Sequence, residues 1–156
     1  MMNNPFPIQR YITAGNRVHL VGIGGVSMCP LAEILQGMGL VVQGSDIANS
    51  ASVQHLRTLG IPVAIASDFN PGSCPSLNLQ LAMSMGYVKY RMTPEEILTA
   101  VTINAACSCG LEEKVGTLEV GKQADIVIWN APDMEMLVYR FGSNLAKTVI
   151  KRGEVV

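Results

Sequence analysis

The chain has 156 residues, about the length of one domain, and its 11 basic and 12 acidic side chains give a net charge of −1. This balance provides no basic face for the phosphates of nucleic acid, so we expect no nucleic-acid partner. Hydrophobic residues make up 49% of the sequence and charged residues only 15%, a composition that predicts a packed core rather than disorder. The chain has only two histidines, His19 and His55, which excludes any mechanism that needs three or four imidazole groups.

The apolar runs are all shorter than the roughly 18 residues that a membrane span requires, so we expect no transmembrane helix and no membrane partner. Residues 1–16 read as a polar lead-in without the basic and apolar regions of a secretory signal. The four cysteines match neither a disulfide framework nor a zinc knuckle. These features predict a cytoplasmic protein.

Residues 17–65 alternate short apolar strands with segments of helical periodicity. The expected order is a strand at Arg17–Val21, a helix from Val26 to Gly37, a strand from Leu40 toward Asp46, a helix marked by Val53, Leu56 and Leu59, and a strand at Ile61–Ala66. This order predicts an α/β fold with a Rossmann-like β-α-β-α-β N-terminal unit of parallel strands.

After residue 66 the sequence changes to a loop dense in turn residues, followed by a helix over 77–85. Thr93-Pro94-Glu95-Glu96 has the form of a capping box with proline in the first helical position, which predicts a helix over about 94–108. Strands are expected at 116–120 and 124–129, and a hairpin with a turn at Arg152-Gly153 is expected near the C-terminus.

A glycine turn with Gly22, Gly24 and Gly25 lies between the first expected strand and the first expected helix. Such a turn lets the backbone approach an anionic ligand at a helix N-terminus, although Ser27 stands where a third glycine completes the dinucleotide fingerprint. Asp46 ends the second strand, where an acidic residue binds a ribose hydroxyl in dinucleotide-binding folds. The pattern predicts contact with a nucleotide.

Three stretches, Val18 to Met28, Leu31 to Leu35 and Gly44 to Asp46, resemble the N-terminal domain of the UDP-N-acetylmuramate–L-alanine ligase family in order and spacing. The resemblance implies a UDP-sugar partner, with the diphosphate at the turn from Gly22 to Ser27 and the uridine end at Ser45 and Asp46. The chain has no Gly-Lys-Ser or Gly-Lys-Thr of the phosphate loop on which that family's ligation depends. We therefore expect no ATP site and no ligation.

The strand expected at Ile61–Ala66 delivers Asp68 at its carboxyl end, where α/β barrels place catalytic groups. Residues from about 60 to 156 are similar to the C-terminal part of the imidazolonepropionase family of amidohydrolases. The motifs that carry this similarity are Ser67-Asp-Phe-Asn-Pro-Gly-Ser73, Met92–Glu96, Val101–Ala106 and Gly116–Asp125.

The similarity implies metal-dependent hydrolysis of imidazolone propionate, a step of histidine degradation. It implies a zinc or iron ion held by Asp68 and substrate contacts from Asn70, Gly72 and Ser73. It also implies that residues 61–156 comprise the last barrel strand, helices and a small β-sandwich remnant.

The histidine count opposes a complete metal centre, because the family takes a His-x-His pair and a further histidine beside the carboxylate, and this chain has no His-x-His. We therefore expect a truncated fusion without complete catalysis, joined at the strand near residues 60–65 that suits both families. Three interpretations stay open: a hydrolase remnant with one metal ligand, a non-catalytic nucleotide-binding module that retains the UDP-sugar site, and a non-functional chimera.

The resemblance to the hydrolase family implies only the last of its barrel strands in this chain. Without the other barrel strands, we expect apolar faces that must find new cover or drive self-association. The residues concerned are Leu77, Leu79, Leu81, Ile97, Leu98 and Val101.

Overall fold

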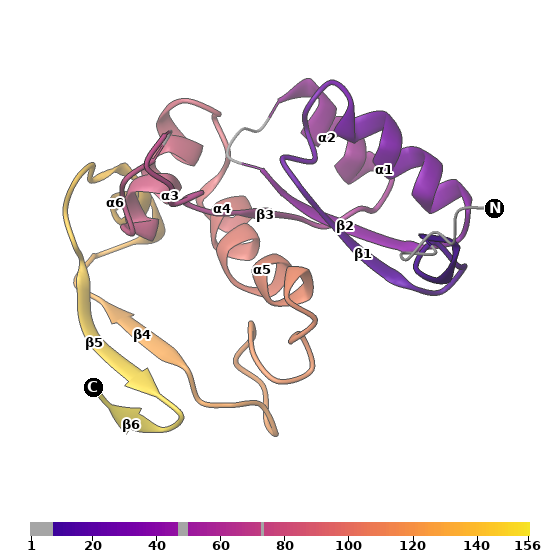
Figure 1. Ribbon diagram of the computed structural model, residues 1–156. Coiled ribbons are helices and arrows are strands. Elements are labelled where there is room, and N and C mark those ends of the chain that lie inside the picture. The colour runs from indigo at the N-terminus through magenta and orange to yellow at the C-terminus, as the bar shows by residue number, and fades with distance from the viewer. Residues whose placement is uncertain (1–7, 47–49, 73) are drawn as a thin grey trace.

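The computed structural model describes residues 8–46, 50–72 and 74–156. Ser73, one of the expected substrate contacts, therefore lies outside the described residues. The described chain forms two three-stranded sheets that are connected by a group of helices (Figure 1). None of the helices in these ranges is long and apolar enough to cross a lipid bilayer.

The N-terminal sheet is parallel, with strand order β1-β2-β3. After a short 3-10 turn at Ile8–Arg10, its elements are β1 (Arg17–Val21), α1 (Met28–Gly37), β2 (Val41–Asp46), α2 (Ala51–Thr58) and β3 (Val63–Ile65). The predicted β-α-β-α-β order and the parallel pairing are confirmed. Because nucleotide-binding folds and α/β barrels both contain such units, the Rossmann-like assignment stays a prediction.

Both faces of the parallel sheet are covered by helices (Figure 1). On one face, α1 and α2 pack against the strands around a core of Leu20, Ile23, Ala32, Leu35, Val42, Val53, Leu56 and Ile61. On the other face, α5 packs against β2 and β3, and the side chain of Asn104 donates to the carbonyl oxygen of Val63 at 3.1 Å. An ion pair between Arg17 on β1 and Glu112 after α5 also joins the N-terminal strands to the rest of the chain.

In the described ranges, four helices follow the parallel sheet: α3 (Leu79–Val88), α4 (Pro94–Val101), α5 (Ile103–Ser108) and α6 (Met134–Tyr139). The predicted capping box is confirmed, since the Thr93 hydroxyl accepts from the Glu96 amide at 3.2 Å and the Glu96 carboxylate accepts from the Thr93 amide at 2.9 Å.

The prediction of one continuous helix over 94–108 is wrong. Thr102 separates α4 from α5 with φ −115° and ψ −92°, and its hydroxyl donates to the carbonyl oxygen of Leu98 at 2.5 Å. A threonine that bonds back to the preceding turn slightly destabilises and bends a helix, and α4 ends at this residue.

The C-terminal sheet is antiparallel, with β4 (Ile126–Trp129), β5 (Ala146–Lys151) and β6 (Glu154–Val155) in the order β4-β5-β6. Positive φ angles at Arg152 and Gly153 confirm the predicted hairpin turn. The predicted strand at 116–120 is wrong, because this segment pairs with no strand among the described residues. The predicted β-sandwich remnant is accordingly a single sheet in the described part of the chain.

The apolar faces predicted to lack cover are partly covered. Ile97 is fully buried in a second core that it shares with Ile65, Met83, Met92, Ala100, Leu137, Val138 and Leu145. Leu81, Leu98 and Val101 are intermediate in exposure, whereas Leu77 and Leu79 remain 78% and 42% exposed. The beginning of α3 thus keeps an exposed apolar surface.

Candidate functional site

The candidate site lies along the carboxyl edge of the parallel sheet. Since all three strands run in the same direction, the turn after β1, the end of β2 and the loop after β3 meet at this edge, where α/β sheets bind ligands. The fold therefore places the predicted nucleotide residues and the predicted hydrolase residues along the same edge of one sheet.

Backbone hydrogen bonds join the glycine turn to the end of β2. The amides of Gly22 and Ile23 donate to the carbonyl oxygen of Ser45 at 2.7 and 3.2 Å, and the Gly24 amide donates to the Asp46 carboxylate at 2.8 Å. Gly22 has φ 68°, a left-handed conformation that favours glycine. The structure thus brings together the predicted residues Gly22, Gly24, Ser45 and Asp46, but it uses the turn amides within the protein.

Few amide groups of the turn are left for an anion. The Gly25 amide donates to the carbonyl oxygen of Gly22, and Pro30 in the first turn of α1 has no N–H group. From Gly22 to Leu31, Val26 and Ser27 are the described residues whose amides have no acceptor. The expected diphosphate site therefore offers two amide donors, and the negative charge of the Asp46 carboxylate lies beside them. This arrangement binds phosphate less favourably than the sequence predicted.

Packing accounts for the glycine at position 24. A Cβ atom there would lie 2.5 Å from Cγ2 of Val53 and 2.9 Å from both the Asp46 carboxylate and the Ser50 hydroxyl. Ser50 in turn caps α2, because its hydroxyl accepts from the Val53 amide at 3.2 Å. A side chain at position 24 would therefore disturb the start of α2.

Both histidines lie in the N-terminal unit. His19 on β1 places Nε2 3.2 Å from the Ser45 hydroxyl, and burial lowers its pKa, which favours the neutral ring. His55 on α2 places Nε2 3.3 Å from the Glu33 carboxylate on α1. Each ring is thus held by a neighbour within this unit.

The loop after β3 is organised by the side chain of Asn70. Its amide nitrogen donates to the carbonyl oxygen of Asp68 at 2.7 Å, and its amide oxygen accepts from the Gly72 amide at 2.9 Å. Asn70 and Cys74 also exchange backbone hydrogen bonds, and Asp68 has a left-handed φ of 50°. The predicted substrate contacts Asn70 and Gly72 are therefore brought together, as parts of one turn.

The residues present do not fit a zinc or iron centre. Catalytic zinc takes three protein ligands and keeps a further position open, with histidine prominent among the donors. In the ranges that the structure describes, no group of three histidine, cysteine, aspartate or glutamate side chains could hold a metal ion. Asp68 is thus the single predicted ligand of a centre that these residues do not assemble.

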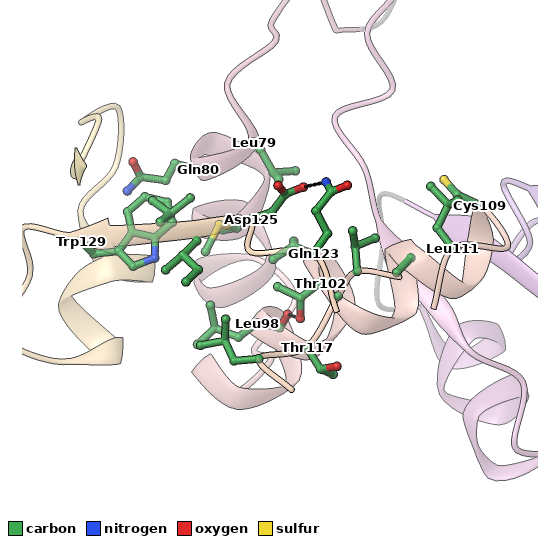
Figure 2. Close-up of a pocket in the computed structure, with 18 residues that line it drawn as sticks. Leu79, Gln80, Leu98, Thr102, Cys109, Leu111, Thr117, Gln123, Asp125 and Trp129 are labelled. Atoms are coloured by element: carbon green, nitrogen blue, oxygen red, sulfur yellow. Dashed lines mark hydrogen bonds between the residues drawn. The ribbon is translucent and has the colours of Figure 1, made fainter. Parts of the chain in front are cut away.

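A cavity that the sequence did not predict lies beside β4 (Figure 2). We call it the β4 groove; it has a volume of about 680 Å³ and lies between α3, α4, the segment 109–118 and β4. Its apolar lining includes Leu79, Met83, Leu98, Val101, Leu118 and Trp129.

Asp125, which lines the β4 groove, already has several partners. Its carboxylate accepts from the Lys151 ammonium at 2.6 Å, from the Arg152 backbone amide at 2.9 Å and from the side-chain amide of Gln123 at 2.7 Å. These hydrogen bonds, with that from Lys151 the largest cause, lower the pKa of Asp125 to about 2. This carboxylate therefore stabilises the β5–β6 turn.

Comparison with known proteins relates the chain to one family. The model of the amidohydrolase family matches residues 18–156. The chain is 48% identical over 106 residues to the imidazolonepropionase of Alkaliphilus oremlandii, a match that covers 68% of this chain and 25% of that protein. It is 50% identical over 101 residues to the imidazolonepropionase of Caldanaerobacter subterraneus subsp. tengcongensis, covering 65% of this chain and 24% of that protein.

The solved structures give a similar fold. An adenosine deaminase from Xanthomonas campestris with bound zinc matches with a TM-score of 0.66 and 17% identity, covering 90% of this chain and 45% of that chain. An amidohydrolase from Thermotoga maritima matches with a TM-score of 0.60 and 17% identity over 95% and 45% of the two chains. The chain spans about a quarter of the length of the two imidazolonepropionases named above. Nothing in these matches supports the ligase resemblance.

Proposed function

The chain belongs to the amidohydrolase family, and we propose that it is a carboxyl-terminal part of an imidazolonepropionase that does not hydrolyse imidazolone propionate by itself. The single observation that carries the proposal is its close identity to imidazolonepropionases over only a quarter of their length. Such a part supplies a strand and its loop to an active site and leaves the other walls of that site to the rest of the enzyme.

In this proposal Asp68 is the functional side chain of the part. It follows β3 at the carboxyl edge of the parallel sheet, where barrel enzymes carry their catalytic groups. The Asn70 side chain fixes the loop before and after itself. It donates to the Asp68 carbonyl oxygen across Phe69 and accepts from the Gly72 amide across Pro71. Asn70 and Gly72 thereby act as positioning residues for Asp68.

The lack of catalysis by the isolated chain follows from the donor set. Hydrolysis on a metal ion requires several ligands around one open position, and the described residues include no group of three side chains that could hold such an ion. We propose that the remaining donors belong to the part of the imidazolonepropionase sequence that this chain lacks.

Transplantation tests the proposal. The matched 106-residue segment replaces its counterpart in the Alkaliphilus oremlandii imidazolonepropionase, and hydrolysis of imidazolone propionate is measured. We expect activity within about tenfold of the parent enzyme and a loss of at least about a thousandfold with Asp68→Asn, since a side chain at the reacting centre is typically worth that much.

The matched control is Asp133→Asn, which changes the same functional group at the N-cap of α6, where asparagine is an equally good cap. A folded transplant without activity, or an Asp68→Asn variant as active as the Asp133→Asn control, would refute the proposed function.

A second candidate is a non-catalytic nucleotide-binding module. The observation that favours it is the close approach of the Gly24 amide and the Asp46 carboxylate at the ends of β1 and β2, the position of a ribose-binding acid. Calorimetry with UDP-N-acetylmuramate tests it: the candidate predicts binding that Asp46→Ala weakens and Asp68→Ala does not. The absence of heat at millimolar ligand would remove the candidate.

A further inference from the structure

We propose that Ser45 and His19 form a nucleophile–base pair that accepts the acyl group of small activated esters and then releases it to water. The two residues lie on β2 and β1, whereas the proposed function uses the loop after β3. The inference therefore concerns a second chemistry of the chain, which needs one hydroxyl group and one imidazole group.

The parallel pairing of β1 with β2 brings the two side chains together (Figure 1). His19 stands opposite Gln43, and Ser45 follows two residues later on β2, so His19 and Ser45 are diagonal neighbours on adjacent strands. Residues two apart on a strand project from the same face of the sheet. Oγ of Ser45 and Nε2 of His19 lie 3.2 Å apart, which is within reach of a hydrogen bond.

The pair lies outside the apolar core of the N-terminal unit. Leu20 and Val42, which alternate with the residues of this face, are buried in the core that α1 and α2 cover. Ser45 and His19 themselves are only half-buried. Neither side chain is therefore committed to apolar packing, and a small acyl donor is more readily admitted to this strand surface than a large one.

The histidine suits the role of a base at neutral pH. Burial lowers the pKa of His19, so its imidazole is neutral there. A serine is typically activated by a neutral imidazole whose nitrogen lies about 2.6–3.2 Å from the hydroxyl oxygen. With the ring proton on Nδ1, the Ser45 hydroxyl donates to Nε2, and Nε2 is then the atom that takes the proton.

The other ring nitrogen sets the class of substrate. Nδ1 of His19 is buried, and in the described part of the chain no group forms a hydrogen bond with it. In a serine–histidine–aspartate triad, a carboxylate at this nitrogen stabilises the imidazolium that forms when the base takes the proton. Without such a partner the imidazolium is costly, so we expect reaction only with good leaving groups, as in aryl esters.

The reaction is an acyl transfer followed by hydrolysis. The Ser45 oxygen attacks the ester carbonyl carbon while its proton passes to Nε2 of His19, and the phenolate leaves with the electron pair of the broken C–O bond. The imidazolium then gives its proton to the phenolate or to water. Water attacks the acyl-serine with Nε2 as its base, the carboxylic acid leaves, and Ser45 regains a proton from His19.

Diisopropyl fluorophosphate tests the pair, because it phosphorylates activated serines and leaves a stable adduct. The Ser45 oxygen bonds to phosphorus, fluoride leaves, and the proton passes through His19 to water. We expect an adduct that mass spectrometry of the peptides places on Ser45. His19→Gln can still form a hydrogen bond with Ser45 but takes up no proton. It should slow the labelling about a hundredfold or more, since general-base catalysis contributes about 10²–10⁴-fold.

The chain offers a matched control for each residue. Ser108 is also half-buried, but its hydroxyl donates to the carbonyl oxygen of Asn104 at 2.9 Å, and His55 is the other histidine of the chain. Ser108→Ala and His55→Gln should be labelled on Ser45 as fast as the unaltered chain. Circular dichroism confirms that each variant is folded before the rates are compared.

The second step is measured with p-nitrophenyl acetate. Acid quenching and mass spectrometry should show acetyl-Ser45 that forms and then decays after the ester is removed, because water releases the acyl group. A folded chain that carries no adduct on Ser45 at millimolar fluorophosphate overturns the proposal. Labelling of Ser45 that His19→Gln leaves unchanged would refute the role of His19 as the base, and an acetyl group that stays on Ser45 would refute its release to water.

Discussion

Replacing Gly24 with alanine tests the physical account of the glycine turn. We expect Gly24→Ala to destabilise the N-terminal unit because the new methyl group enters occupied space. It would lie 2.5 Å from a methyl group of Val53, which is 2% exposed and cannot turn into solvent. It would also lie 2.9 Å from the Asp46 oxygen that accepts from the residue's own amide.

The magnitude follows from these contacts. Overpacking of a buried site costs about 1–3 kcal/mol, and displacement of the Ser50 hydroxyl from its capping position costs up to about 2 kcal/mol more. We therefore expect a loss of about 1–5 kcal/mol in the free energy of unfolding, measured by urea denaturation followed by circular dichroism.

Gly37→Ala is the matched control. Gly37 is the last residue of α1, its backbone is free of positive φ, and a Cβ atom there would meet nothing within 4 Å. Alanine at this position should stabilise the chain by about 0.5–1 kcal/mol through helix propensity. If Gly24→Ala unfolds within about 0.5 kcal/mol of the unaltered chain, packing does not require glycine there and the reasoning is wrong.

Three further predictions concern the C-terminal part and the thiols. Gln80→Leu should cost about 1–3 kcal/mol in urea denaturation, because the buried Gln80 oxygen accepts from the Leu145 amide at 2.8 Å and the variant leaves that N–H without an acceptor; an unchanged midpoint would contradict this. The unaltered chain should be more stable than Asp125→Asn at neutral pH. Because the pKa of Asp125 falls from 3.8 to about 2 on folding, this advantage should shrink as the pH drops below 3.8 and vanish near 2, whereas a constant difference would refute the role of its charge. Burial and the nearby Glu33 carboxylate raise the pKa of the Cys29 thiol, so a maleimide should label the exposed Cys109 first at neutral pH, and equal labelling rates by mass spectrometry would contradict the burial of Cys29.

The N-terminal elements could be predicted from the sequence because local signals and packing agree there. The strand at Arg17–Val21 has the predicted bounds, and apolar residues at helical spacing predicted α1 and α2. The capping box at Thr93 was found from spacing alone, because its hydrogen bonds join residues three apart in the sequence.

The errors have both long-range and local causes. Residues 116–120 have strand-like alternation, but no neighbouring strand completes their hydrogen bonds. The break at Thr102 lies where the threonine hydroxyl bonds back to Leu98, a contact that bends helices and that apolar spacing does not reveal. The short helix α6 was not predicted, although Asp133 as its N-cap was a signal that could have found it.

The candidate site shows the same division. Glycine spacing and the acid at the end of β2 predicted that Gly24 and Asp46 belong to one site. They lie together because the carboxyl ends of parallel strands meet at one edge of the sheet. The sequence could not show that the turn amides are used internally or that Asn70 closes the loop after Asp68. The β4 groove depends on how α3 and α4 lie against the edge of β4, which no local pattern encodes.

The central claim is that this chain carries one residue of a hydrolytic centre without holding the whole of it. The most direct test equilibrates the purified chain with an equimolar amount of zinc or ferrous iron, removes free metal, and measures metal content and hydrolysis of imidazolone propionate on the same sample. We predict metal well below one ion per chain, unchanged by Asp68→Ala, and no hydrolysis above the buffer rate. One tightly bound ion per chain that Asp68→Ala removes, together with turnover, would contradict the claim.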